Sequence, residues 1–140
     1  MYCYFIKTVH IIKLISINAI LSMTLLFANP SYAETILIKQ NQTIQSVIDS
    51  ARIVKGGTLH LQGIANGDII IEQGGTLYLQ GVVNGTISNE GGNLFIQGVC
   101  NFLLAKKGYT EISGIVTTLI QGKHGKVLIK PGSIISGKKY

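Results

Sequence analysis

The chain has 140 residues, of which 17 are glycine, and its 12 Lys and Arg outnumber its 6 Asp and Glu. This length is typical of one domain. So few acidic residues argue against sites that need several carboxylates, such as calcium sites or the paired acids of glycosidases.

Residues 1–33 predict a cleaved secretory signal. Two lysines precede an apolar run from Leu14 to Phe27, and the segment closes with small residues that end at Ala33. This order of basic, apolar and small residues is that of a signal peptide. We therefore expect export to the periplasm, the cell surface or the medium. The alternative is an anchor formed by an uncleaved transmembrane helix that begins near Ile11.

Cleavage after Ala33 would remove Cys3 and leave Cys100 as the one cysteine of the mature protein. An internal disulfide is then impossible, so burial and backbone hydrogen bonds must hold the domain together. Cys100 occupies a repeat position that Ala65 and Val83 fill elsewhere. This predicts a small core residue rather than a nucleophile.

Residues 34–55 predict a short strand followed by a capping helix. The strand is expected at residues 36–38. The apolar residues of the helix recur at i, i+3, i+4 and i+7, at Ile44, Val47, Ile48 and Ala51. This spacing is typical of an amphipathic helix, and Thr43 is placed as its N-cap. Such a helix would cover the open end of the domain.

Three similar phrases follow and indicate the fold. They read GGTLHLQGIANG from Gly56, GGTLYLQGVVNG from Gly74 and GGNLFIQGVCNF from Gly91, at spacings of 18 and 17 residues. Each has a row of alternating apolar residues, such as Leu59, Leu61 and Ile64, which predicts strands. Glycines between them suit tight corners. A repeat this short is typical of a solenoid, in which successive coils pair with one another.

We therefore predict an all-β, single-stranded, right-handed parallel β-helix of about five coils. The repeats are expected over residues 56–137, with a basic tail at 138–140. Gly108 and Gly125 continue the phase of the diglycines at 17-residue steps, which extends the count beyond the three clear units. No second helix is predicted at the C-terminal end, so copies of the chain are expected to stack end to end there.

The order GGTLYLQGVVNGTI, with its glycine corners and alternating aliphatics, resembles the bactofilins. The likeness spans about residues 56–122 and is carried by Gly63, Gly67, Ile69, Gly81, Gly85, Ile87 and Gly98. It implies a β-helix that polymerises end to end as an envelope scaffold. The diglycine phrases are also similar to autotransporter adhesin passengers, which implies an adhesion module or a fragment of a longer adhesin. Residues 41–63 are similar to the first helix and coil of pectin-lyase-like β-helices, which implies carbohydrate binding or turnover.

Three aromatic residues take equivalent positions in the three phrases: His60, Tyr78 and Phe95. Strand alternation places them outward in one column. Such a column would form an interaction surface or stack on sugar rings. Alternatively, it is a ladder of cross-strand pairs that stabilises the sheet.

The C-terminal part of the chain is basic, since from Lys106 onward it holds seven lysines and Glu111 as its one acidic residue. A basic patch is predicted at Lys123, Lys126, Lys130, Lys138 and Lys139. It would contact an anionic membrane surface or an envelope polysaccharide, or it would protect the end of the stack. Nucleic acid is not expected as a partner outside the cell.

A polar corner with Glu72, Glu90, Lys106 and Lys107 is the one candidate for chemistry. Repeat alignment places Glu72 opposite Asn89 and Lys106. A carboxylate pair there would suit a carbohydrate-active protein, whereas ion pairing on a solvated turn explains the charges more simply. We predict no catalytic, cofactor or metal residue, and expect a non-enzymatic envelope scaffold or interaction module.

Overall fold

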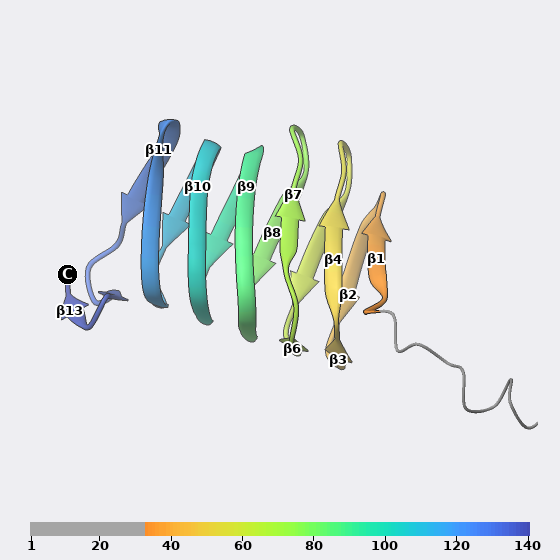
Figure 1. Ribbon diagram of the computed structural model, residues 1–140, viewed down its shortest axis with the longest axis horizontal. Coiled ribbons are helices and arrows are strands. Elements are labelled where there is room, and N and C mark those ends of the chain that lie inside the picture. Colours follow the sequence, from red (N-terminus) through yellow and green to blue (C-terminus); the bar gives the residue numbers. More distant parts are fainter. Residues whose placement is uncertain (1–32) are drawn as a thin grey trace, which may run out of the picture. The chain divides into compact units, whose positions relative to one another are not determined.

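The computed structural model describes residues 33–140, so the predicted signal peptide and the alternative anchor lie outside the described residues. The described part contains thirteen strands and no helix. It is a parallel β-solenoid of about six turns (Figure 1). A search of these residues for an apolar helix of membrane-spanning length finds none.

The strands stack in three columns along the solenoid. The first column contains β1 (Thr35–Ile38), β4 (Ser50–Ile53) and β7 (Ile69–Ile71). The second contains β2 (Asn41–Ile44), β5 (Thr58–Leu61) and β8 (Thr76–Leu79), and the third β3 (Val47–Ile48), β6 (Ile64–Ala65) and β12 (Ile134–Ile135). Three long strands turn the corners and contribute to all three columns: β9 (Val82–Ile96), β10 (Val99–Ile112) and β11 (Ile115–Ile129).

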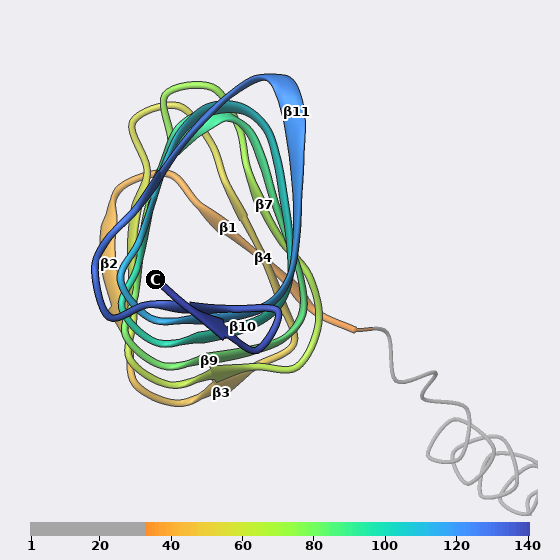
Figure 2. The same ribbon diagram turned by 90° about the vertical axis from the view of Figure 1, so that its left-hand side faces the viewer.

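The solenoid is right-handed, as predicted. Figure 2 is viewed from the C-terminal end, and the chain runs counter-clockwise through β1, β2, β3 and β4 as it approaches the viewer. This is the hand that parallel crossovers favour. One pair departs from the parallel rule, because β13 (Lys138–Lys139) is antiparallel to β12.

Inward side chains form aliphatic rows that hold the coils together. In the second column, Leu59, Leu77 and Leu94 stack in register and are fully buried. Cys100 is also fully buried and lies between Val83 and Val116, which confirms its predicted core position. Burial raises the pKa of its thiol to about 12, so the thiolate that a nucleophile requires is absent at neutral pH.

The predicted capping helix is wrong, because residues 41–53 form β2, β3 and β4. The helix-like spacing has another cause. Ile44, Ile48 and Ala51 point inward from three successive strands, while Val47 is 61% exposed. The corner between β3 and β4 shifts the two-residue alternation by one residue, so the inward residues follow at intervals of four and then three residues, as they would on a helix. This first coil also raises the count from the predicted five to about six turns.

The third column contains a further correction. Ile64, Val82 and Val99 belong to the alternating apolar rows of the sequence, yet they point outward, and Ile64 is 39% exposed. The inward position is taken by the next residue of each strand. Six outward aliphatics therefore line one face of the solenoid, at Val47, Ile64, Val82, Val99, Ile115 and Ile134.

The predicted basic tail is not a separate element. Its residues 138 and 139 form β13, which folds back on β12 and covers the end of the third column. The first and second columns end with the corresponding parts of β11, which have no further strand beyond them within residues 33–140. The C-terminal end is thus open in two of its three columns.

Candidate functional site

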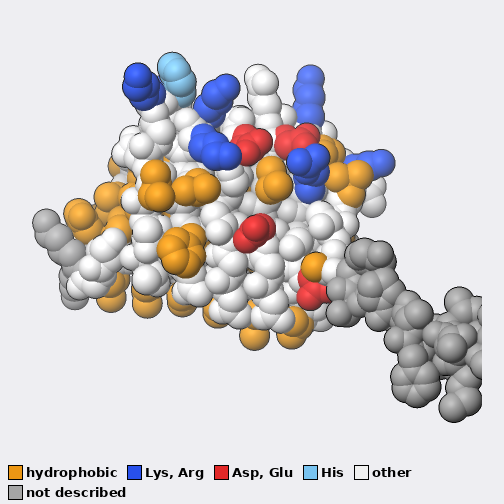
Figure 3. All heavy atoms as spheres, in the orientation of Figure 1, with side chains coloured by type: hydrophobic (Ala, Val, Ile, Leu, Met, Phe, Trp, Pro, Cys, Tyr) orange, Lys and Arg blue, Asp and Glu red, His pale blue; other side chains and the backbone are white. Residues whose placement is uncertain are grey.

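A hollow of about 290 Å³ opens on the outer face of the first column, over β7, β9 and β10. This face is turned toward the viewer in Figure 3. The hollow is lined by Asp68, Ile70, Thr86, Ser88, Glu90, Leu104 and Lys106. Its lining therefore combines two carboxylates, one ammonium group, hydroxyls and aliphatic side chains.

Glu90 is the acidic centre of the hollow. Lys106 Nζ lies 2.9 Å from Glu90 Oε1, and Ser88 Oγ donates to the same oxygen at 3.3 Å. The hydrogen bond from Lys106 is the main reason that the pKa of Glu90 is lowered. A general acid needs a pKa raised toward the working pH, so this environment is the opposite of the one that proton donation requires.

The other carboxylates near the hollow also have partners. Glu72 forms an ion pair with Arg52 at 3.3 Å, and Asp68 accepts a hydrogen bond from the Thr86 N–H at 2.8 Å. Ion pairing, the simpler interpretation of the polar corner, is confirmed for Glu72 and Glu90.

The predicted alignment at this corner is one residue out, because Ile71 and not Glu72 lies opposite Asn89. Asn89 is fully buried in the core row that Ile71 occupies one coil earlier. Its Oδ1 accepts from the N–H groups of Gly91 and Gly92 at 3.2 and 2.9 Å. Its Nδ2 lies within donating distance of the Gly92 carbonyl, the Tyr109 carbonyl and Thr110 Oγ1.

Asn89 holds the corner at which the coil shortens. Asn89 pairs with Ile71, 18 residues earlier, whereas Asn93 pairs with Thr76, 17 residues earlier, so the corner between Asn89 and Asn93 has one residue less than the corner of the preceding coil. The alignment of Asn89 with Glu72 instead predicts a position at a solvated polar corner. The signal that could have identified its buried position is that an asparagine follows the isoleucines at 53 and 71 in the same inward row.

The aromatic column is confirmed in register. The rings of His60 and Tyr78 stack with centroids 4.7 Å apart and planes 7° apart, and those of Tyr78 and Phe95 at 4.9 Å and 9°. Tyr109 packs at an angle against Phe95, at 5.9 Å and 56°. Because each ring faces its neighbour along the axis, the column presents ring edges to solvent. Stacking on a sugar needs a free ring face, so the geometry suits the stabilising ladder better.

The second column ends in a small charged cluster beside these rings. Tyr109 Oη donates to Glu111 Oε2 at 2.9 Å, and Lys130 Nζ lies 3.2 Å from Glu111 Oε1. The hydrogen bond from Tyr109 and the ammonium group of Lys130 lower the pKa of Glu111, and the same hydrogen bond raises that of Tyr109.

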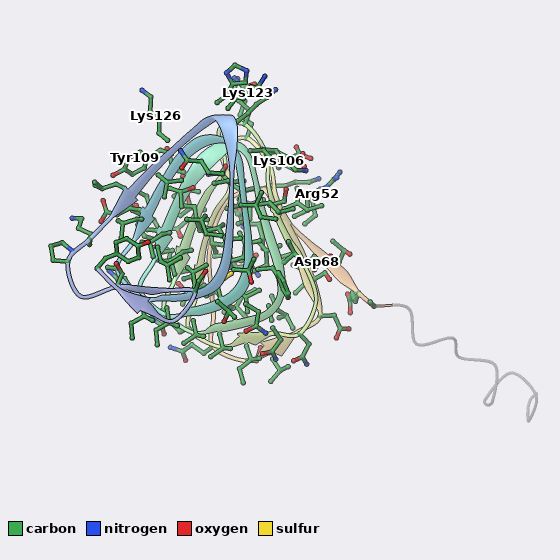
Figure 4. All side chains as sticks on the ribbon, turned by 60° about the vertical axis from the view of Figure 1, so that its left-hand side comes forward. Arg52, Asp68, Lys106, Tyr109, Lys123 and Lys126 are labelled. Atoms are coloured by element: carbon green, nitrogen blue, oxygen red, sulfur yellow. The ribbon has the colours of Figure 1, made fainter. Side chains whose placement is uncertain are left out.

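The five lysines of the predicted basic patch do not lie in one place. In Figure 4, Lys123 projects from the corner between the first and second columns, Lys106 lies on the first-column side of it, and Lys126 lies on the second-column side, opposite Tyr109. Lys130 instead pairs with Glu111. Lys138 and Lys139 belong to β13 at the end of the third column.

The outward aliphatic row of the third column lies between two amide ladders. Gln45, Gln62, Gln80 and Gln97 join their side chains at 2.8, 3.0 and 3.4 Å. On the other side, the amide of Asn84 donates to Asn66 at 3.0 Å, and that of Asn101 to the Asn84 carbonyl at 3.0 Å. The Gln and Asn side chains of both ladders are uncharged, so the aliphatic row has neutral neighbours on each side.

In residues 33–140, no three His, Cys, Asp or Glu side chains are grouped closely enough to hold a metal ion. Comparison with known proteins found no matching family model, no matching curated protein and no matching solved structure. The functional argument therefore depends on the geometry of this chain.

Proposed function

We propose that this chain is an exported, non-enzymatic β-solenoid that serves as a scaffold or interaction module of the cell envelope and assembles end to end. The observation that carries the proposal is the open backbone edge at each end of the stack that residues 33–140 form. Unpaired strand edges are templates for pairing with another chain unless they are protected.

The N-terminal edge is formed by β1 and β2. The Ile38 carbonyl accepts from the Val54 N–H at 3.1 Å, so Ile38 directs its backbone polar groups toward the second coil. Along a strand of a parallel sheet, successive residues direct their backbone N–H and C=O groups toward opposite neighbouring strands. Thr35 and Leu37 therefore direct theirs away from the solenoid, and among the described strands β1 pairs with β4 alone.

The C-terminal edge is complementary. The Lys130 N–H donates to the Ile112 carbonyl at 2.8 Å. By the same alternation, Val127 and Ile129 direct their backbone groups outward beyond the last coil. The first-column row that begins at Ile36 ends at Leu119, and both residues are partly buried against the core. A second copy in register would bury both side chains and continue the ladder.

Proline at Leu37 tests this assembly. Leu37→Pro removes an N–H that points away from the solenoid, and proline is tolerated at such an edge position. Leu37→Val keeps the N–H and is the matched control. Sedimentation and electron microscopy should show concentration-dependent rods for the wild type and the control, and monomers for the proline variant. A wild type that stays a sharp monomer at high concentration would overturn the proposal of end-to-end assembly.

A carbohydrate-binding or carbohydrate-active protein is the second candidate, and the hollow at Asp68, Glu90 and Lys106 is the observation that favours it. Incubation with a panel of acidic polysaccharides separates the two functions. Turnover that Glu90→Gln abolishes would replace the scaffold proposal with an enzymatic one. The lowered pKa of Glu90 supports the expectation of no turnover.

A further inference from the structure

Large apolar side chains are exposed on the first-column face near its C-terminal end. The outward residues of β10 there are Phe102, Leu104 and Lys106, and Ile120 of β11 lies opposite Leu104. Phe102 is 51% exposed and Ile120 58%. In Figure 3 hydrophobic side chains gather on this half of the face. Adjacent exposed apolar residues of this size mark an interaction site.

Lysines border this apolar patch along the corner between the first and second columns. Lys106, Lys107, Lys123 and Lys126 are all exposed, and Figure 4 shows Lys106, Lys123 and Lys126 around this corner. Lys106 is neutralised by Glu90 at 2.9 Å. Within residues 33–140 no carboxylate lies within ion-pair distance of the other three lysines. The corner therefore carries positive charge that nothing in the described chain compensates.

We propose that this patch, defined by Phe102, Leu104, Ile120 and the lysines 107, 123 and 126, docks on the surface of an anionic phospholipid membrane. Charge complementarity identifies the partner, because anionic headgroups attract basic residues near the surface. The apolar residues would enter the boundary between headgroups and acyl chains. An acidic polysaccharide would pair with the lysines and leave Phe102 and Ile120 in water.

The third column provides an internal comparison. Its outward row also exposes aliphatic side chains, with Ile64 at 39% and Ile115 at 41%, but neutral amide ladders flank it. If exposed aliphatics alone caused membrane binding, this row would bind as well. The proposal requires the apolar residues and the unpaired lysines together, so it assigns binding to the first column.

The test is co-sedimentation with vesicles, using residues 33–140, the compact unit that contains the whole core, and then the full chain. Vesicles that contain phosphatidylglycerol should bind the protein, whereas pure phosphatidylcholine vesicles should not. High salt should weaken binding, because it screens exposed charges. Thermal unfolding of each variant verifies that its exposed substitutions leave the fold intact.

Two variants and one control separate the contributions. Lys107→Gln, Lys123→Gln and Lys126→Gln together should weaken binding by on the order of a hundredfold. Phe102→Ser with Ile120→Ser should weaken it by about tenfold or more. Ile64→Ser with Ile115→Ser, in the third column, should bind like the wild type.

Three results would overturn the inference. The first is equal binding to both kinds of vesicle, and the second is a control variant that loses as much binding as the patch variants. The third is a combination of two outcomes: the Phe102 and Ile120 variant binds vesicles like the wild type, and the lysine variant loses binding both to vesicles and to a soluble acidic polysaccharide. This combination would indicate a polysaccharide partner. The monomeric Leu37→Pro variant keeps the patch, so failure of end-to-end assembly is distinguishable from failure of membrane docking.

Discussion

Asn89 provides the sharpest test of how this solenoid is held together. Replacing it with leucine keeps a similar volume at a position whose neighbour in the row is Ile71. The replacement removes the acceptor for the N–H groups of Gly91 and Gly92. It also removes the donor to the Tyr109 carbonyl and to Thr110 Oγ1.

Each buried polar group that is left without a partner costs about 1–3 kcal/mol. Two orphaned backbone N–H groups therefore predict a loss of about 2–6 kcal/mol in the free energy of unfolding, and a fall in Tm on the order of 10–30 °C. Urea and thermal unfolding, followed by circular dichroism, measure both quantities for residues 33–140.

Asn66→Ala is the matched control, because Asn66 also accepts a side-chain hydrogen bond, from Asn84, but is exposed. Its substitution should change stability by about 0.5 kcal/mol or less. At low pH, the loss in the free energy of unfolding caused by Asn89→Asp should lie between the losses caused by Asn66→Ala and Asn89→Leu. The protonated aspartic acid retains a carbonyl acceptor but has one donor instead of two. If Asn89→Leu costs no more than Asn66→Ala, the buried network does not hold the shortened corner, and the reasoning is refuted.

Three further substitutions test the core and the stacked rings. Tyr78→Ala removes two stacked contacts and should cost about 1–3 kcal/mol in urea unfolding; a double-mutant cycle with His60→Ala that shows no coupling would contradict it. Because the Cys100 pKa is raised to about 12, the unfolded thiol ionises first, so stability should fall by about 1.4 kcal/mol per pH unit from about pH 9 upward. Cys100→Val should remove this fall in stability at high pH. If the wild type and Cys100→Val lose stability identically as the pH rises, the Cys100 thiol is not its cause. A Cβ on Gly81 would lie 1.9 Å from the Gly63 carbonyl oxygen, so Gly81→Ala should cost about 1–3 kcal/mol by overpacking; an unchanged urea midpoint would show that this corner can relax.

The sequence predicts the solenoid well because its period is carried by many equivalent residues. The diglycines, the inward leucines and the aromatic column repeat together, so each copy confirms the alignment of the others. Leu59, Leu77 and Leu94 lie in the predicted row, and the outward register of His60, Tyr78 and Phe95 is correct. Repetition fixes which residues stack, but it does not reveal ring orientation, which depends on side-chain rotamers.

The errors arise where the repeat degenerates or turns a corner. At residues 44–51, inward residues from three faces imitate a helix, because sequence spacing does not distinguish one helical face from several short strands. Between Cys100 and Phe102 the coil loses one residue, and the Asn-Gly corner of the earlier phrases is not repeated there to reveal the shift. The outward position of Ile64 follows from a two-residue alternation that continues unbroken from Leu61 to Ala65, so a row that passes from Leu61 to Ile64 leaves the inward face.

End-to-end assembly would also change the strength of membrane docking. Strands of neighbouring coils lie about 4.8 Å apart, so a stack of six-turn copies would repeat the basic and apolar patch roughly every 29 Å along one face. Each added copy then binds its part of the same membrane at a high effective concentration. We expect the wild type and Leu37→Pro to bind anionic vesicles alike at dilution. Above the assembly concentration the wild type should bind more tightly. If the two proteins bind alike at every concentration although the wild type forms rods, successive patches do not lie on one face, and the register inferred for the contact between copies is wrong.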